Sequence, residues 1–177
     1  MSGISQRRTT LQKLDARART ILPFALTVIV LLFGLTPTYV PGLAQITPLY
    51  SLVAVYYWAV YRPDLLGYGL GFAVGVLEDL LTGAPLGVGA LTLLLTQWIV
   101  FNQQKFFHAK PFAITWVAFG IVAFGAFLIK WLCIGLITSG GLTPFGDMFA
   151  AYLVTIAVYP LIAWLFSKAQ TGLMSEV

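Results

Sequence analysis

The chain has 177 residues, of which 59% are hydrophobic and only 9% are charged. Soluble domains usually have about 25% charged residues, so this composition argues against an ordinary soluble protein and favours one compact membrane domain. Half of the ten basic residues lie within the first twenty positions, next to an apolar segment. That placement favours contact with anionic lipid headgroups and argues against binding of nucleic acid. A single cysteine, Cys133, excludes an internal disulfide.

Six apolar stretches are long enough, or nearly so, to cross a bilayer as helices, which takes about 20 residues. We therefore expect an all-α integral membrane protein with six transmembrane helices in a compact bundle. A basic cytoplasmic N-terminal segment, 1–20, precedes this predicted membrane domain, 21–168, and a tail, 169–177, follows it. The predicted helices are 21–40, 46–61, 65–82, 86–102, 111–137 and 144–167.

Residues that start or break helices support these boundaries. Asp64 is a candidate cap for the third predicted helix, and Pro85 and Pro111 suit the first turns of the fourth and fifth. Thr143 and Pro144 likewise suit the start of the sixth. Prolines inside apolar segments predict kinks or broken turns, which are tolerated where neighbouring groups bond to the freed carbonyls. These prolines are Pro23, Pro37 and Pro160.

The polar leader before the first predicted helix is about twenty residues long, and this length favours a retained anchor over a cleaved signal peptide. Thr9 and Gln12 in the leader have the spacing of a capping box. This pattern fits a short amphipathic helix on the inner face of the membrane and a flexible basic tail equally well.

Lysine and arginine are distributed unevenly between the connections of the predicted bundle. The outer connections, 41–45, 83–85 and 138–143, contain neither residue type. Because cytoplasmic loops carry the excess of positive charge, this asymmetry predicts six spans with both termini in the cytoplasm. The basic residues on the predicted inner side, beyond those of the leader, are Arg62, Lys105, Lys110 and Lys168.

Glycines recur every fourth residue in the third predicted helix, and an aspartate takes one position of the series. The series is Gly67, Gly71, Gly75, Asp79 and Gly83. Positions four apart share one face of a helix, so these residues form a stripe of small side chains with one carboxylate in it. In membranes such stripes let another helix approach closely. The stripe therefore predicts a packing seam or partner interface, with a helix of this chain or of another.

Three ionisable residues, Glu78, Asp79 and Lys130, lie inside predicted spans, where charge is costly and often functional. Asp79 and Lys130 lie at similar predicted depths, about 5 Å apart at a rise of 1.5 Å per residue. We therefore predict an Asp79–Lys130 ion pair with a structural role, and a ligand or proton site is the alternative. Glu78 points about 100° away from Asp79, which predicts that it reaches the outer surface or a partner protein.

No residue constellation indicates an enzyme. His108 is the single histidine, and it lacks the additional ligands that a metal site needs and a nucleophile at plausible depth. The glycines of the third predicted helix do not follow a strand, so they do not form a phosphate-binding loop. We therefore expect a non-enzymatic protein without a metal or cofactor.

The stretch from Gly75 to Gly87 reads GVLEDLLTGAPLG. A glycine, an aspartate four residues later and then Leu-Leu-Thr-Gly-x-Pro-Leu-Gly resemble the signature of MreD, the family of rod shape-determining membrane proteins of bacteria. The aromatic–proline pair Tyr159-Pro160 also resembles the family, whereas Glu78 beside the aspartate is unusual for it and leaves open which acid has the family role. The positions that match the motif are Gly75, Asp79, Gly83, Pro85, Leu86 and Gly87.

The resemblance implies a protein of the bacterial inner membrane that works in the cell-elongation complex. Its implied partners are MreC, the cell-wall synthase RodA with its penicillin-binding partner, and, indirectly, MreB filaments. The resemblance also implies a helical arrangement similar to that of the substrate-binding subunits of energy-coupling-factor transporters.

Two functions are therefore open. The first is a membrane scaffold that binds MreC through small-residue surfaces and links it to peptidoglycan synthesis. The second is a small-ligand, vitamin-like binding subunit of a transporter, which needs an enclosed pocket with several polar groups. The predicted outer ends offer few such groups, and this shortage favours the scaffold.

Overall fold

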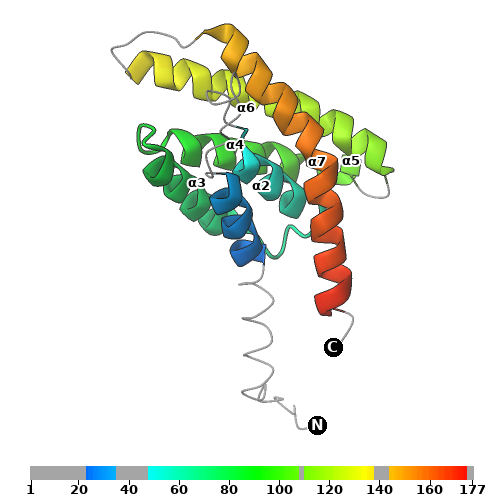
Figure 1. Cartoon of the computed structure of the whole chain (residues 1–177). Helices are drawn as coiled ribbons and strands as arrows, with labels where there is room; N and C mark the ends of the chain where they lie inside the picture. Colours follow the sequence, from blue (N-terminus) through cyan, green and yellow to red (C-terminus); the bar gives the residue numbers. More distant parts are fainter. Residues whose placement is uncertain (1–22, 35–47, 108–109, 138–143, 175–177) are drawn as a thin grey trace, which may run out of the picture.

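The computed structural model describes residues 23–34, 48–107, 110–137 and 144–174, and every regular element in these ranges is an α-helix (Figure 1). The all-α prediction is thus confirmed for the described residues. The predicted features of the leader, at Thr9 and Gln12, lie outside them, as do Pro37 and Thr143. The helices are Pro23–Gly34, α2 (Tyr50–Tyr61), α3 (Tyr68–Thr82), α4 (Val88–Asn102), α5 (Gln104–Phe107), α6 (Phe112–Ile137) and α7 (Phe145–Met174).

Two of these helices are long and apolar enough to cross a membrane, α6 and the part of α7 from Phe145 to Ala169. The helices α2, α3 and α4 have 12, 15 and 15 residues, so they are shorter than the spans predicted for them. Two further apolar helices, Pro23–Gly34 and α4, fall below the length of a full span. The length and composition of these helices fit a membrane protein.

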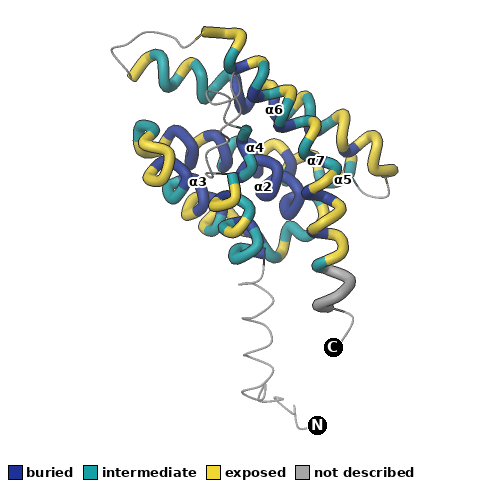
Figure 2. Tube along the Cα trace, viewed as in Figure 1, coloured by how far each residue is buried: buried dark blue, intermediate teal, exposed yellow. Residues whose placement is uncertain are grey.

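The short helix α2 lies in the interior of the fold. Every residue from Ser51 to Ala59 is buried, so the helix is enclosed around its whole circumference (Figure 2). A helix that is apolar on all sides is stable only when it is covered on all sides. α4 and α7 provide much of this cover, because both pack along α2. α2 therefore meets protein where a peripheral membrane helix would meet lipid.

Aromatic side chains fill the space between α2, α6 and α7. The ring of Phe119 stacks on Tyr159 with centroids 4.4 Å apart, and it lies 5.0 Å from the ring of Tyr56. The Tyr56 hydroxyl donates a hydrogen bond of 3.1 Å to the Thr115 carbonyl, so its one polar group is satisfied inside the core. These contacts join α2 to α6 and α7, which lie much later in the sequence.

The helix α3 begins later than predicted, and the predicted cap at Asp64 is wrong. Its N-terminal flanking residue is Gly67, which makes no side-chain cap hydrogen bond. The preceding segment turns instead, because the Leu65 N–H donates to the Arg62 carbonyl at 3.1 Å. Asp64 is exposed beside this turn, one turn of chain before the helix starts.

The prolines predicted near helix starts lie at or just before them. The Pro85 carbonyl accepts the Val88 N–H at 3.2 Å, and the Pro111 carbonyl accepts the Ile114 N–H at 3.0 Å. The Pro144 carbonyl accepts the Asp147 N–H at 3.2 Å in the same way. Proline suits these positions because its missing N–H has no helical partner there.

The fold separates two sets of helix ends. The turn from α3 to α4 lies at one side of the molecule together with the end of α6 and the start of α7 (Figure 1). The end of α4, the short helix α5 and the start of α6 lie at the opposite side (Figure 1). This second side contains Lys105 and Lys110.

α7 continues through Pro160 and changes direction partway along its length (Figure 1). Proline has no N–H, so it leaves the carbonyl of Ile156, four residues earlier, without its helical donor. The indole N–H of Trp116, on α6, donates to this carbonyl at 3.1 Å. A neighbouring helix thus satisfies the group that the proline frees, as the sequence predicts for prolines inside apolar segments.

This arrangement predicts that Trp116 and Pro160 are energetically coupled. Trp116→Phe removes the donor and should lower the free energy of unfolding by about 1 kcal/mol, the scale of interhelical hydrogen bonds in membranes. Pro160→Ala restores the N–H within α7, so Trp116→Phe should cost clearly less in that background. Unfolding of the four proteins in mixed micelles measures the difference. An equal loss in both backgrounds would show that the indole acts only by packing.

Candidate functional site: the α3–α4 hairpin and the adjacent ion pair

The glycine stripe of α3 faces α4 of the same chain. α3 packs more extensively on α4 than on any other described helix. A Cβ placed on Gly75 would lie 2.6 Å from the backbone nitrogen of Ala90 and would also overlap its Cα. The two backbones therefore meet at a point where no side chain fits.

Gly71 provides room for a polar side chain of α4. A Cβ at Gly71 would overlap the amide of Gln97, which is buried against it. The Gln97 Nε2 donates to the Leu66 carbonyl at 3.0 Å, so the amide joins the segment before α3 to α4. The Oε1 of Gln97 is buried and has no hydrogen-bond partner among the described residues.

The other two glycines of the stripe have different roles. Gly67 precedes the first turn of α3, and a Cβ there would meet nothing within 4 Å. Gly83 ends α3 in the left-handed conformation, with φ of 69°, and it too has open space around it. A left-handed residue at the end of a helix favours glycine because other residues are strained there. The close approach is thus confined to Gly71 and Gly75.

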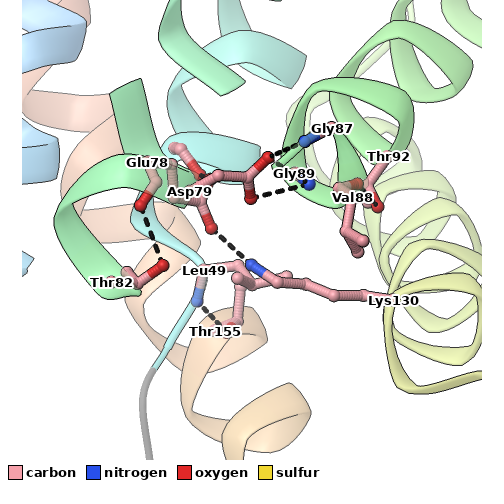
Figure 3. Close-up of polar contacts among 11 residues, drawn as sticks. Leu49, Glu78, Asp79, Thr82, Gly87, Val88, Gly89, Thr92, Lys130 and Thr155 are labelled. Atoms are coloured by element: carbon pink, nitrogen blue, oxygen red, sulfur yellow. Dashed lines mark hydrogen bonds and ion pairs between the residues drawn. The ribbon is translucent and has the colours of Figure 1, made fainter. Parts of the chain in front are cut away.

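Asp79 is fully buried and binds the start of α4. One carboxylate oxygen accepts the Gly87 N–H at 2.8 Å, and the other accepts the Gly89 N–H at 2.8 Å (Figure 3). The first N–H groups of a helix lack partners within the helix, and the helix dipole makes this end favourable for negative charge. Asp79 therefore caps α4 from the neighbouring helix, and its charge is compensated without a cation.

The remaining motif residues shape the turn that makes this cap possible. Gly87 has φ of 99° and precedes the first residue of α4, and Pro85 accepts the N–H of Val88. Gly89 leaves space for the Asp79 carboxylate, because a Cβ there would lie 3.1 Å from the carboxyl carbon. Leu86 is exposed at the tip of the turn. The motif from Gly75 to Gly87 thus describes one closed helical hairpin.

The predicted Asp79–Lys130 ion pair is wrong, because Lys130 binds Glu78. The Lys130 Nζ lies 2.5 Å from Glu78 Oε1, and the two side chains are 15% and 5% exposed (Figure 3). The Ser51 hydroxyl, at the start of α2, donates to the other oxygen of Glu78. The prediction that Glu78 reaches the outer surface or a partner protein is therefore also wrong.

Direction around α3, and not depth along it, decides which acid meets Lys130. The glycine stripe faces α4, and Asp79 lies on that stripe, so its carboxylate points at α4. Lys130 lies on α6 and meets the adjacent side of α3, which carries Glu78. Placing the stripe against the next helix in the chain assigns the two acids correctly.

A cavity of about 620 Å³ opens beside the ion pair, between the end of the helix Pro23–Gly34, the start of α2, the end of α3, the second half of α6 and the start of α7. Its walls are mainly apolar, and its charged lining residues are Glu78, Lys130 and Asp147. Both members of the ion pair line it, so the pair joins α3 to α6 at the wall of the cavity. The polar partners missed from the sequence are the side chains of Ser51 and Gln97 and the backbone N–H of Gly89.

The part of the chain that the structure describes adds no catalytic constellation. Within the described ranges, no group of three metal-ligating side chains comes together, and His108 lies outside those ranges. Cys133 is half-buried on α6.

The model of the rod shape-determining protein MreD family matches residues 17–169 of the chain. No curated protein and no solved structure gives a match. The matched region includes the whole α3–α4 hairpin, with the residues whose geometry explains the motif. This chain therefore belongs to the MreD family of rod shape-determining proteins.

Proposed function

We propose that this protein is a non-enzymatic membrane scaffold of the bacterial cell-elongation complex. It binds MreC and, with RodA and its penicillin-binding partner, links cell shape to peptidoglycan synthesis, while MreB filaments are indirect partners. The observation that carries this proposal is membership of the MreD family over residues 17–169, which implies a role in rod-shape determination.

The proposed location is the inner membrane, with six spans and both termini in the cytoplasm. The absence of lysine and arginine from the connections 41–45, 83–85 and 138–143 supports this orientation. The enclosure of α2 supports the inclusion of a helix of only 12 residues in such a bundle, because protein covers its sides from Ser51 to Ala59.

The structure also changes where a partner helix is expected to bind. Gly71 and Gly75 face α4, so they are unavailable to MreC. α6 offers a different surface, on which Val117 and Ile121 are 64% and 72% exposed. Gly125 lies one turn after Ile121, and a Cβ there would meet nothing within 4 Å. A transmembrane helix of MreC can approach closely at this glycine.

Gly125→Leu therefore tests the scaffold directly. The substitution should leave folding intact, because the position is open, and should reduce recovery of MreC in detergent copurification at least about tenfold, equivalent to 1.4 kcal/mol. Rescue of rod shape in a depleted strain should fail in parallel. Gly69→Leu is the matched control, because Gly69 is another helical glycine with open space around it. Full MreC recovery with Gly125→Leu would contradict this interface.

One observation favours the second candidate function, a small-ligand binding subunit of a transporter. The 620 Å³ cavity lies within the range of small-molecule sites, about 300–1,000 Å³, and charged residues line it. A transporter subunit should support uptake of its ligand into cells and need not retain MreC. The family match favours the scaffold over the transporter subunit.

A further inference from the structure

In the ion pair that lines the cavity, Lys130 retains unused hydrogen-bond donors, whereas both oxygens of Glu78 already accept hydrogen bonds. Each oxygen of Glu78 already accepts a hydrogen bond, one from Lys130 and one from Ser51. The Lys130 ammonium has three donors, and Glu78 takes one of them. Lys130 is also the more exposed member of the pair. Lys130 therefore presents unused N–H donors to the cavity, and these suit an anionic oxygen.

A separate negative charge lines the cavity at the start of α7. Asp147 is half-buried there, and its backbone N–H bonds to the Pro144 carbonyl. No hydrogen bond or ion pair to the Asp147 carboxylate is found among the described residues. A ligand that places an anion on Lys130 must offset this second charge, so it needs a cationic donor as well.

The rest of the lining is apolar and suits a hydrocarbon chain. Its apolar residues include Leu31 on the first helix, Phe127, Trp131 and Ile134 on α6, and Met148 on α7. Side chains of this kind pack against an acyl chain without desolvating any polar group. A small hydrophilic zwitterion would leave this surface without a partner.

We propose that the cavity binds a zwitterionic aminophospholipid, whose phosphate bonds to Lys130 and whose primary ammonium bonds to Asp147. The acyl chains lie along the apolar lining. The unused donors of Lys130 fit phosphate oxygens, and the Asp147 carboxylate fits a primary amine that can donate a hydrogen bond. Phosphatidylglycerol lacks the amine, and phosphatidylcholine has a cationic group without N–H donors, so both should bind more weakly.

The test uses the full-length protein, delipidated in detergent, with lipid binding followed by native mass spectrometry and by thermal unfolding. Phosphatidylethanolamine should bind at least about tenfold more tightly than phosphatidylglycerol or phosphatidylcholine of the same chains. Asp147→Asn should remove this preference, because an amide does not compensate the ammonium charge. Asp64→Asn is the matched control, because Asp64 is exposed and does not line the cavity.

Three outcomes would overturn the proposal. Equal affinity for the three lipids would show that the headgroup is not recognised. An unchanged preference in Asp147→Asn would show that Asp147 does not bind the amine. Binding of free phosphoethanolamine as tight as that of the lipid would assign the site to a soluble aminophosphate. None of these measurements depends on MreC, so their failure is distinguishable from failure of the scaffold.

Discussion

Gly75→Ala is expected to destabilise the protein strongly, although alanine favours helices more than glycine does. The added Cβ would meet the backbone of Ala90, which cannot rotate away as a flexible side chain can. α3 and α4 must then separate, and the cap formed by Asp79 is weakened along with the packing. We expect a loss of about 3 kcal/mol in the free energy of unfolding, at the upper end for overpacked positions.

Alanine substitutions at two other glycines of α3 provide the comparison for Gly75→Ala. Gly71→Ala should cost about 1 kcal/mol, because the Gln97 amide can move but loses its hydrogen bond to the Leu66 carbonyl. Gly69→Ala should stabilise by about 0.5–1 kcal/mol, since that position is open and alanine gains helix propensity. Denaturant unfolding in mixed micelles gives all three values. Similar effects at Gly69 and Gly75 would show that the stripe is not a packing seam.

Removing either member of the Glu78–Lys130 ion pair should also lower the free energy of unfolding strongly. Glu78→Gln leaves the Lys130 ammonium without its counter-charge, and Lys130→Met leaves Glu78 with Ser51 alone. Breaking a buried ion pair from one side costs about 3–5 kcal/mol. The double variant should recover roughly 2 kcal/mol of the summed losses, because neither charge is then left unpaired.

The control is a second double-mutant cycle, in which Asp79 takes the place of Glu78 as the tested partner of Lys130. Asp79→Asn combined with Lys130→Met should give losses that add to within about 0.5 kcal/mol, because Asp79 bonds to Gly87 and Gly89 and not to Lys130. Unfolding free energies of both cycles under identical conditions provide the comparison. Stronger coupling of Lys130 to Asp79 than to Glu78 would contradict the geometry in Figure 3.

The helical class and the close-packed stripe follow from the sequence because both depend on local periodicity. Apolar runs predict the long helices that the structure describes, and four-residue spacing places Gly71 and Gly75 on one face of α3. The lengths of the individual helices are less predictable from the sequence. α2 is buried on all sides by other helices, and the sequence does not distinguish such a core helix from a lipid-facing span.

The partners of the charged residues are harder to predict, because they depend on the rotation of each helix about its axis. Depth alone allows both Glu78 and Asp79 to meet Lys130. The deciding fact is that α4 begins beside Asp79 and presents two unpaired N–H groups to it. Residues of five described helices, from Pro23–Gly34 to α7, line the cavity, so no local pattern contains it.

The cap that Asp79 forms on α4 also bears on how the chain enters the membrane during its synthesis. α3 leaves the ribosome before α4, and until Gly87 and Gly89 follow, the carboxylate has no N–H partners. An unpaired carboxylate is costly in lipid, so α3 alone is a poor substrate for insertion. We therefore expect α3 and α4 to insert together as one unit, and a nascent chain that stops after Thr82 to be retained poorly in the bilayer.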